Sequence, residues 1–298
     1  TTYISEDDRA TVEVLTQGRY TGVGLQVDRR GRHVVVESVI GGSNAERKEM
    51  SIGDVITHID GDSVEAWPLN KIRAALRGDR GTTVTLSVLR MGETPDTVIL
   101  ERSPVELKAV PYSGFIGGSR HGMGYVRIER FTQEAALEVK QAIDDLERIA
   151  SLNGLVLDVR DNPGGLLESA VDVSSLFLNR GSVVVSTEGR ENRSERVYRN
   201  TSQPVYPDTP LVLLVNERSA SASEIVAGAL QDHDRGVVLG QTTFGKGLVQ
   251  VVRSLPHGGS LKMTTARYYT PSGRSIQSNG RPTDIETSPD AHQAFETI

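Results

Sequence analysis

The chain has 298 residues, which favours two domains, because single hydrophobic cores stop growing at about 250–300 residues. Its composition, 37% hydrophobic and 24% charged, is typical of a soluble globular protein, and its net charge of -6 does not indicate binding to nucleic acid or to an anionic membrane. The absence of cysteine excludes a thiol nucleophile and a cysteine-based zinc site. The histidines show no zinc-ligand spacing, so we expect no metal or cofactor. No apolar run approaches the roughly 18 residues of a membrane span.

The first part of the chain has the pattern of a small β-rich domain preceded by a polar segment. Residues 1–17 form this N-terminal segment, in which 5–17 is expected to be a short helix. Apolar alternation and turn residues then predict the elements of the domain. These are strands over 20–27, 33–39, 55–59, 82–90 and 97–102, and helices over 41–50 and 69–76.

Three segments of this part occur in a characteristic order. Gly22-Val23-Gly24-Leu25 is a glycine-rich turn before a strand, Asp60-Gly61 closes a hairpin, and 69–76 is an amphipathic helix. Each of them alone is a common turn or helix. Together they resemble a PDZ domain in the permuted form found in bacterial proteases, which we place at residues 18–103.

The PDZ resemblance implies a peptide-binding site. In such a domain a loop of consecutive backbone N–H groups binds a C-terminal carboxylate, and the adjacent strand pairs with the extended peptide. Arg77, just past the groove helix, is a candidate partner for the carboxylate, although an arginine at such a position is more often solvated. The residues expected to bind peptide are Gly22, Val23, Gly24, Leu25, Leu69, Ile72 and Arg77.

The remaining residues, 104–298, alternate between strands and helices after a linker. Residues 104–123 are rich in proline and glycine, which indicates the linker. The alternation that follows predicts a mixed α/β core with crossover helices. The expected strands are 124–128, 154–160, 182–186, 211–215, 236–240, 248–252 and 259–269, and the expected helices are 132–150, 166–177 and 224–230.

Two turns of this core indicate a reaction. The run Ser219-Ala220-Ser221-Ala222-Ser223 follows an apolar strand and precedes a helix. Its serines therefore lie where backbone N–H groups and the positive end of a helix dipole are exposed. Lys246 lies between two glycines before a later strand. A neutral lysine can take the proton of a serine hydroxyl, as in the Ser–Lys variants of serine proteases. The ordinary alternatives are a helix N-cap and a solvated loop lysine.

A third turn, Asn162-Pro163-Gly164-Gly165, follows an apolar strand and precedes a helix. Glycines let backbone N–H groups approach a ligand closely, and an oxyanion hole needs such groups aimed at the developing negative charge. Taken alone, the motif fits an ordinary strand-to-helix turn better.

Taken together, the motifs of residues 104–298 resemble the C-terminal processing (tail-specific) peptidases. With the PDZ-like part, the resemblance covers nearly the whole chain. It implies a mixed α/β fold, in which a PDZ domain is joined to a crotonase-like α/β protease core, with the Ser–Lys site at their interface. The matching runs are 124–131, 154–167, 219–230, 240–250 and 266–277.

This resemblance also implies a role for individual residues. Ser221, the middle serine of its run, corresponds to the family nucleophile, and Lys246 corresponds to the general base. Gln250, four residues later, corresponds to the residue that orients the lysine. The oxyanion hole corresponds to the backbone N–H groups of Ala222 and of either Gly164 or Gly165.

The function implied is that of a serine endopeptidase that recognises protein C-termini through its PDZ domain. It would cleave near the tail of unfolded or exported proteins, outside the cytoplasm, in a bacterial periplasm or cell envelope. Its partners would be peptides or proteins with accessible C-termini, with a homo-oligomer and an adaptor protein left open. The alternatives are a non-catalytic peptide-binding scaffold and a crotonase-like hydratase or isomerase. His233, near the nucleophile helix, is expected to be a surface residue at a helix end.

Overall fold

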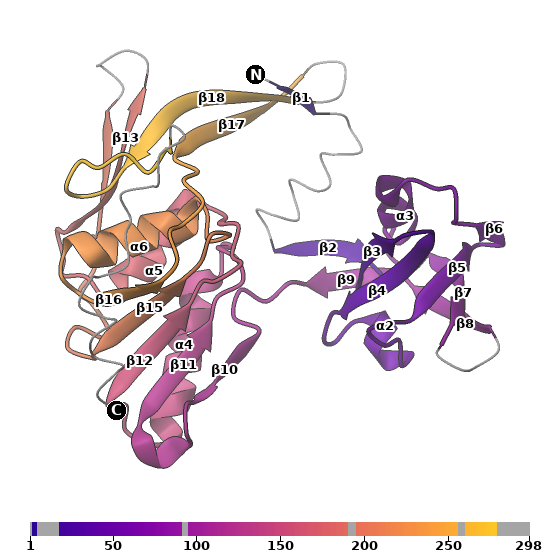
Figure 1. Cartoon of the computed structure of the whole chain (residues 1–298), viewed down its shortest axis with the longest axis horizontal. Coiled ribbons are helices and arrows are strands. Elements are labelled where there is room, and N and C mark those ends of the chain that lie inside the picture. The colour runs from indigo at the N-terminus through magenta and orange to yellow at the C-terminus, as the bar shows by residue number, and fades with distance from the viewer. Residues whose placement is uncertain (1, 5–17, 91–94, 190–194, 256–259, 279–298) are drawn as a thin grey trace. The chain divides into compact units, whose positions relative to one another are not determined.

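The computed structural model of the chain describes residues 2–4, 18–90, 95–189, 195–255 and 260–278. It divides into two compact units (Figure 1). One unit is Ala10–Leu107, and the other is Thr1–Arg9 together with Lys108–Ile298. The short helix predicted over 5–17 lies outside the described residues.

The unit Ala10–Leu107 is a β-rich domain with two short helices. Its elements are β2 (Arg19–Gly22), β3 (Leu25–Arg30), β4 (His33–Val39), α2 (Asn44–Arg47), β5 (Val55–Ile59), β6 (Asp62–Ser63), α3 (Leu69–Ala75), β7 (Thr83–Leu89), β8 (Asp96–Glu101) and β9 (Ser103–Glu106). The main sheet has the order β3-β4-β5-β7-β8, with β6 paired to β5. The pair β2-β9 forms separately from it.

Period-two alternation explains the main sheet of this unit. In β7, the side chains of Val84, Leu86 and Val88 have no exposed surface, and the residues between them are more exposed. Successive side chains of a strand point to opposite faces, so this strand covers a core with one face. Ile72 of α3 lies in the same core and is also completely buried, which closes the sheet face with a helix.

Gly24, at the start of β3, occupies a position that only glycine fits. Its φ is +89°, and a Cβ added there would lie 2.1 Å from the Cβ of Ser43. Ser43 cannot move away easily because it is buried and caps α2, its side chain accepting a hydrogen bond from the N–H of Glu46. The loop 22–25 is therefore packed directly against the start of α2.

The second unit is built on a mostly parallel sheet with three helices. Its central elements are β10 (Tyr112–Phe115), η1 (Ser119–His121), β11 (Met123–Arg127), α4 (Ala135–Ile149), β12 (Gly154–Asp158), α5 (Leu167–Ser175), β15 (Leu211–Val215), α6 (Ala222–Asp232) and β16 (Val237–Gly240). The strand order is β10-β11-β12-β15-β16, and all pairs except β10-β11 are parallel. This is the α/β core with crossover helices that the alternation of elements predicts.

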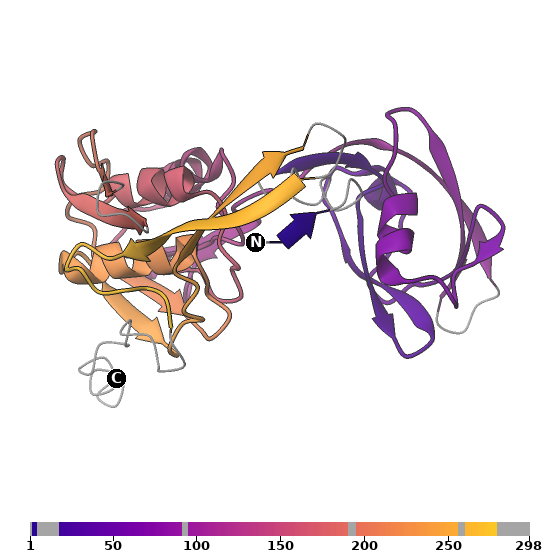
Figure 2. The ribbon, with the colours of Figure 1, turned by 90° about the horizontal axis from the view of Figure 1, so that it is seen from above.

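A second, antiparallel sheet lies on the far side of the helices. It has the order β1-β18-β13-β14, with β17 paired to β18. Figures 1 and 2 show α5 and α6 between this sheet and the parallel sheet, and both helices contact β13. α6 is buried from residue 222 to residue 230, as expected for a helix covered by both sheets. The bounds are β1 (Thr2–Ile4), β13 (Val183–Gly189), β14 (Arg196–Arg199), β17 (Leu248–Ser254) and β18 (Ser260–Tyr269).

The order of the parallel strands brings distant loops together. β12, β15 and β16 are neighbours and run in the same direction, so the segments that follow them leave the sheet at the same edge. These segments contain the glycine loop after Asp158, the serine turn after Val215 and the lysine loop after Gly240. Ligands of open α/β sheets bind at this carboxyl edge.

The structure differs from the expected linker over 104–123. β9 pairs with β2, with Arg19 opposite Glu106, and β10 pairs with β11, with Tyr112 opposite Arg127. The prolines and glycines that indicated a linker lie within or between these short edge pairings, where proline is tolerated because an edge strand need not donate every hydrogen bond.

The packing of Gly24 gives a test of the fold. We expect Gly24→Ala to lower the free energy of unfolding by about 1–3 kcal/mol or more, because left-handed strain is combined with overlap against Ser43. Gly31→Ala is the matched control, since Gly31 has a φ of +62° and no atom within 4 Å of an added Cβ. Its cost should be limited to about 1 kcal/mol. If urea unfolding gave equal losses of stability for the two variants, Gly24 would not be packed against Ser43.

Candidate active site

The serine turn presents one of its three hydroxyl groups differently from the other two. Ser219 and Ser223 are completely buried, and their hydroxyls donate to the carbonyl oxygens of Val159 at 2.7 Å and of Asn162 at 3.0 Å. Ser221 is only partly buried and directly precedes α6. The two flanking serines therefore fasten the turn, while the middle serine remains accessible.

Ser221 also has an unusual backbone conformation. Its φ is 58° and its ψ is -109°, in a region that residues with a side chain rarely adopt. Such conformations persist only where the surrounding structure imposes them, and they cluster at functional sites. Here the N–H of Ser221 donates to the carboxylate of Glu224 at 2.7 Å, one turn into α6.

The glycine loop is joined to the serine turn by Asn162, which is completely buried. Its side-chain amide nitrogen donates to the backbone carbonyl of Ile128 at 2.8 Å, and its backbone carbonyl accepts from the N–H of Ala220 at 2.9 Å. Asn162 therefore connects segments that follow β11, β12 and β15. This explains why the loop and the turn lie side by side although about sixty residues separate them.

The structure distinguishes the two glycines that were candidates for the oxyanion hole. The N–H of Gly164 donates to Oδ1 of Asn162 at 2.8 Å, so it is already used. Within the described residues, no hydrogen bond uses the N–H of Gly165 or the N–H of Ala222. A Cβ on Gly164 would lie 2.8 Å from the Cβ of Ser221 and 3.0 Å from the N atom of Ala222. The loop thus touches the serine turn at a point that only glycine allows.

One buried carboxylate joins the lysine loop to the serine turn. Oε2 of Glu224 accepts from the N–H of Ser221 and from the N–H of Lys246, at 2.7 and 2.9 Å. Oε1 accepts from the N–H of Gly245 at 2.6 Å and from the hydroxyl of Thr243 at 2.8 Å. All four donors belong to the two segments that carry the candidate nucleophile and the candidate base. Glu224 is completely buried, so these bonds replace its contacts with water.

Glu224 was not among the residues predicted for the site. Its only sequence signal is the pattern Ser-x-x-Glu at the start of a helix, which predicts a capping box. The structure has the bond from the N–H of Ser221 to Glu224 that belongs to this pattern, and Glu224 accepts three further bonds from a segment about twenty residues further along the chain. Burial raises the pKa of Glu224, and the hydrogen bonds that it accepts oppose this shift.

The structure does not join the side chains of the three predicted catalytic residues to one another by hydrogen bonds. Lys246 and Gln250 are exposed, although the proposed use of Lys246 as a base calls for burial. Among the described residues, no hydrogen bond joins the side chain of Ser221, Lys246 or Gln250 to another of the three. The structure thus assembles the backbone of the site and leaves the lysine side chain in solvent.

An ion pair between a buried carboxylate and an exposed arginine supports the strand that leads into the glycine loop. Asp158 has no exposed surface, and its carboxylate accepts from the hydroxyl of Tyr125 at 2.6 Å and from Nε and Nη2 of Arg160 at 2.9 and 2.5 Å. Burial alone would raise the pKa of Asp158, but the bonds from Arg160 and Tyr125 outweigh it and hold that pKa below its usual range. The charged carboxylate is therefore favoured at the end of β12.

The residues predicted to bind peptide lie together in the unit Ala10–Leu107. β3 is an edge strand of its sheet and contacts α3, and the N–H of Val23 donates to the carbonyl of Leu76 at 3.2 Å. Arg77 forms an isolated bridge with Gly22, and its guanidinium lies over the ring of Tyr20 at 5.1 Å. The end of α3 is therefore joined to the loop 22–25.

Two of these predictions need correction at the level of the side chain. Ile72 and Val23 are 0% and 1% exposed, because both belong to the core of the unit. They support the groove from beneath and offer no open surface to a peptide. Leu69 is partly buried and packs against the same core.

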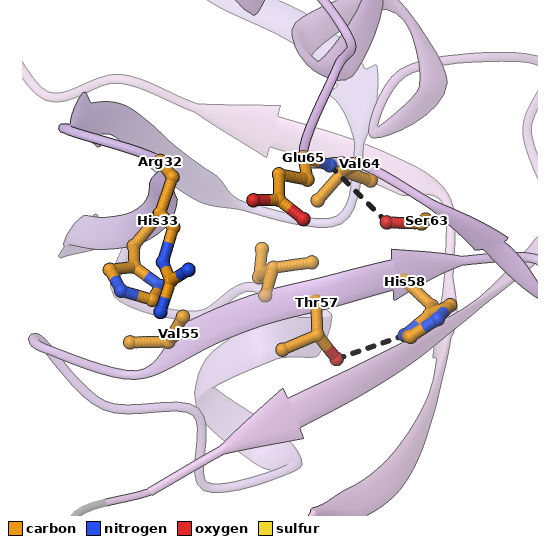
Figure 3. A pocket seen from close by; sticks show the side chains of 9 residues that line it. Arg32, His33, Val55, Thr57, His58, Ser63, Val64 and Glu65 are labelled. Atoms are coloured by element: carbon orange, nitrogen blue, oxygen red, sulfur yellow. Dashed lines mark hydrogen bonds between the residues drawn. The ribbon is translucent and has the colours of Figure 1, made fainter.

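A pocket of about 220 Å³ lies elsewhere in this unit, over β5 and the segment 63–65. Figure 3 shows Arg32 and His33 at one end, His58 at the other, and Glu65 between them on the opposite side. None of the residues predicted to bind peptide lines it. The hydrogen bonds drawn there, from the N–H of Glu65 to Ser63 and between His58 and Thr57, are local to the segments.

Other potential ligands and bases do not join the site. His233 ends α6, where a ring nitrogen lies 2.7 Å from the carbonyl of Val183, which confirms that it is an exposed residue at a helix end. In the part of the chain that the structure describes, no group of three or more His, Cys, Asp or Glu side chains is placed to hold a metal ion. No helix among the described residues is long and apolar enough to cross a membrane.

Comparison with protein families gives two matches. A model of peptidase family S41 matches residues 122–287, and a model of the PDZ domain matches residues 11–89. The first range contains the serine turn, the glycine loop and the lysine loop, and the second contains β3 and α3.

Individual proteins agree with these matches. A carboxy-terminal-processing protease of Bartonella bacilliformis is 38% identical over 95% of this chain, and a probable CtpA-like serine protease of Staphylococcus aureus is 32% identical over 99%. The chain spans 65% and 58% of the lengths of these two relatives. Among solved structures, a photosystem II D1 C-terminal processing protease has a TM-score of 0.57 and 32% identity, covering 97% of this chain and 78% of that one.

The bridging carboxylate gives a test of the site. In Glu224→Gln, the amide NH₂ would face backbone N–H donors that now share a carboxylate. We expect a loss of about 1–3 kcal/mol in the free energy of unfolding, because donors are left unsatisfied in the interior. We also expect a drop of about 100-fold or more in peptide cleavage, because the two loops lose their common anchor.

Thr243→Val is the matched control for this variant. It removes one of the four donors to Glu224 and leaves the carboxylate and the other three bonds in place. Its effect on cleavage should be much smaller, within about 10-fold. Full cleavage activity of a folded Glu224→Gln protein would show that the bridge does not position the site.

Proposed function

Because this chain belongs to peptidase family S41, we propose that it is a serine endopeptidase that uses a Ser–Lys pair to cleave proteins near their C-termini. The observation that supports this most directly is the bridge made by Glu224, which holds the backbone of Ser221 and the backbone of Lys246 on one carboxylate oxygen. No structural need of the fold requires a strained, accessible serine to be tied to a lysine loop in this way. A catalytic pair needs its two loops to be held close together, and this bridge does so.

The proposed reaction begins with the attack of Ser221 on the scissile carbonyl carbon. Lys246, in its neutral form, accepts the hydroxyl proton as the bond from Oγ to carbon forms. Gln250 orients the lysine in this arrangement. The negative charge that develops on the carbonyl oxygen is stabilised by the N–H of Ala222, at the positive end of α6, and by the N–H of Gly165.

The second half of the proposed reaction releases the products. The tetrahedral intermediate collapses, the C–N bond breaks, and Lys246 returns the proton to the leaving amine. Lys246 then takes a proton from water as the water oxygen attacks the acyl carbon, the bond from that carbon to Oγ of Ser221 breaks, Lys246 returns the proton to Oγ, and the new C-terminal carboxylate departs. Since Lys246 is exposed in this structure, its side chain must turn towards Ser221 for the reaction to proceed.

The substrates proposed are proteins with accessible, loosely folded C-terminal tails. Their recognition is assigned to the groove between β3 and α3, where a terminal carboxylate would lie against the loop 22–25 and the chain before it would add to the edge of β3. The similarity to carboxy-terminal-processing proteases supports this choice. By the same resemblance we place the protein in the periplasm or cell envelope.

The test of this function is cleavage of casein by the wild-type chain and by two variants between pH 6 and pH 10. Wild-type cleavage should rise with pH, because a lysine acts as a base only in its neutral form. Ser221→Ala and Lys246→Ala should each reduce the rate by roughly 10⁴-fold or more, as for other catalytic groups that act as a unit. His233→Ala should cleave normally. Peptide binding without turnover in every protein would support a scaffold instead.

A further inference from the structure

The groove of the unit Ala10–Leu107 contains a cation that none of the assigned roles uses. Arg73 lies in the middle of α3, and its Nη2 donates to the backbone carbonyl of Val27, in β3, at 3.3 Å. The guanidinium therefore extends from the groove helix to the edge strand that faces it. Arg73 is an exposed side chain that makes this single, long hydrogen bond in the described part of the chain.

The carbonyl that Arg73 contacts is one that an added strand would need. β3 pairs with β4 on one side only, so the polar backbone groups on its other side are open to a peptide. In an antiparallel ladder, a hydrogen-bonded residue directs its N–H and its C=O to the same neighbour. Because the carbonyl of Val27 points towards α3, Val27 is a residue that would exchange hydrogen bonds with a bound peptide.

The charges around Arg73 favour an anionic ligand. Burial lowers the pKa of Arg77, the nearby Tyr20 opposes this shift, and the positive charge of Arg73 lowers that pKa further. Among the described residues, no carboxylate forms an ion pair with either of them. Arg29, by contrast, lies on β3 and donates to three backbone carbonyls of the segment before α3. Arg73 and Arg77 thus both lack a carboxylate partner among the described residues, and of the two only Arg73 has no assigned role.

We propose that Arg73 gives the groove a preference for protein tails that carry Asp or Glu two positions before the C-terminal residue. This inference rests on the proposed function, in which the groove binds C-termini. It names the chemical class of the tails that the groove selects. An acidic tail supplies the anionic partner that Arg73 lacks in the free groove.

The position of the acidic residue, two before the C-terminal residue of the peptide, follows from the geometry of strand addition. A terminal carboxylate bound at the loop 22–25 places the last peptide residue beside Leu25, and a peptide antiparallel to β3 then places the residue two earlier beside Val27. Its backbone N–H takes the carbonyl of Val27 and displaces the guanidinium of Arg73. The displaced guanidinium remains next to the side chain of that same residue, where a carboxylate can accept a bidentate pair of hydrogen bonds.

The experiment uses the full chain with Ser221→Ala, so that bound peptides are not cleaved. Two fluorescein-labelled decapeptides with free C-termini, ending in Glu-Ala-Leu and in Gln-Ala-Leu, are titrated by fluorescence anisotropy. The glutamate peptide should bind about 1.5- to 5-fold more tightly, the range expected for an exposed charge pair. Adding Arg73→Gln should reduce this ratio to about 1 and leave binding of the glutamine peptide in place.

Lys71→Gln is the matched control for the loss of a positive charge on α3. Lys71 is two residues before Arg73, so it lies on a different face of the helix, and its Nζ lies 3.7 Å from the centre of the Trp67 ring. The preference for glutamate should persist in this variant. In the starting protein the preference for glutamate should also weaken as salt is raised to 0.5 M, because exposed charge pairs are screened.

Four results would overturn the inference. Equal binding of the two peptides by the starting protein, or a preference that survives Arg73→Gln, would show that Arg73 does not select acidic tails. Equally tighter binding of both peptides by Arg73→Gln would show that the guanidinium only blocks the strand edge. Absence of binding by either peptide would instead remove the proposed recognition of C-termini, and this inference with it.

Discussion

The hydrogen bonds accepted by the Glu224 carboxylate are the interaction on which the rest of the candidate site depends. A carboxylate with no exposed surface is costly unless donors replace its water, and here four donors do so. Since they come from the serine turn and from the lysine loop, the requirement to satisfy one buried charge fixes the distance between the two segments. The strained backbone of Ser221 is kept in place by the same bond.

The parallel sheet supplies the frame in which this interaction can form. β12, β15 and β16 are adjacent and parallel, so their carboxyl ends deliver the glycine loop, the serine turn and the lysine loop to one edge. Asn162 then links the first two by accepting from Ala220. Three segments spread over about ninety residues thus meet without any of them crossing the core. The other unit has its own sheet, helix and core, and the arginines of its groove lie on β3, on α3 and just after α3.

Much of the fold follows from local patterns. The alternation in β7 and the buried strand β12 were predictable because period and apolar content are properties of short segments. The site was predictable only in part. Motifs identified Ser221 and Lys246 as candidates, but the bridge through Glu224, the use of the Gly164 N–H by Asn162 and the complete burial of Ile72 depend on contacts between distant segments. The exposed position of Lys246 is likewise a tertiary property that no spacing reveals.

The central claim is that Ser221 attacks the peptide bond at the edge where these loops meet. It is tested most directly by trapping the covalent intermediate: the wild-type chain is mixed with a cleavable peptide, quenched in acid within seconds, digested and analysed by mass spectrometry. We predict that the N-terminal fragment of the peptide is attached to Ser221 and to neither Ser219 nor Ser223, whose hydroxyls are buried and hydrogen-bonded. Attachment to another residue, or cleavage in which no acylated species forms, would contradict the claim.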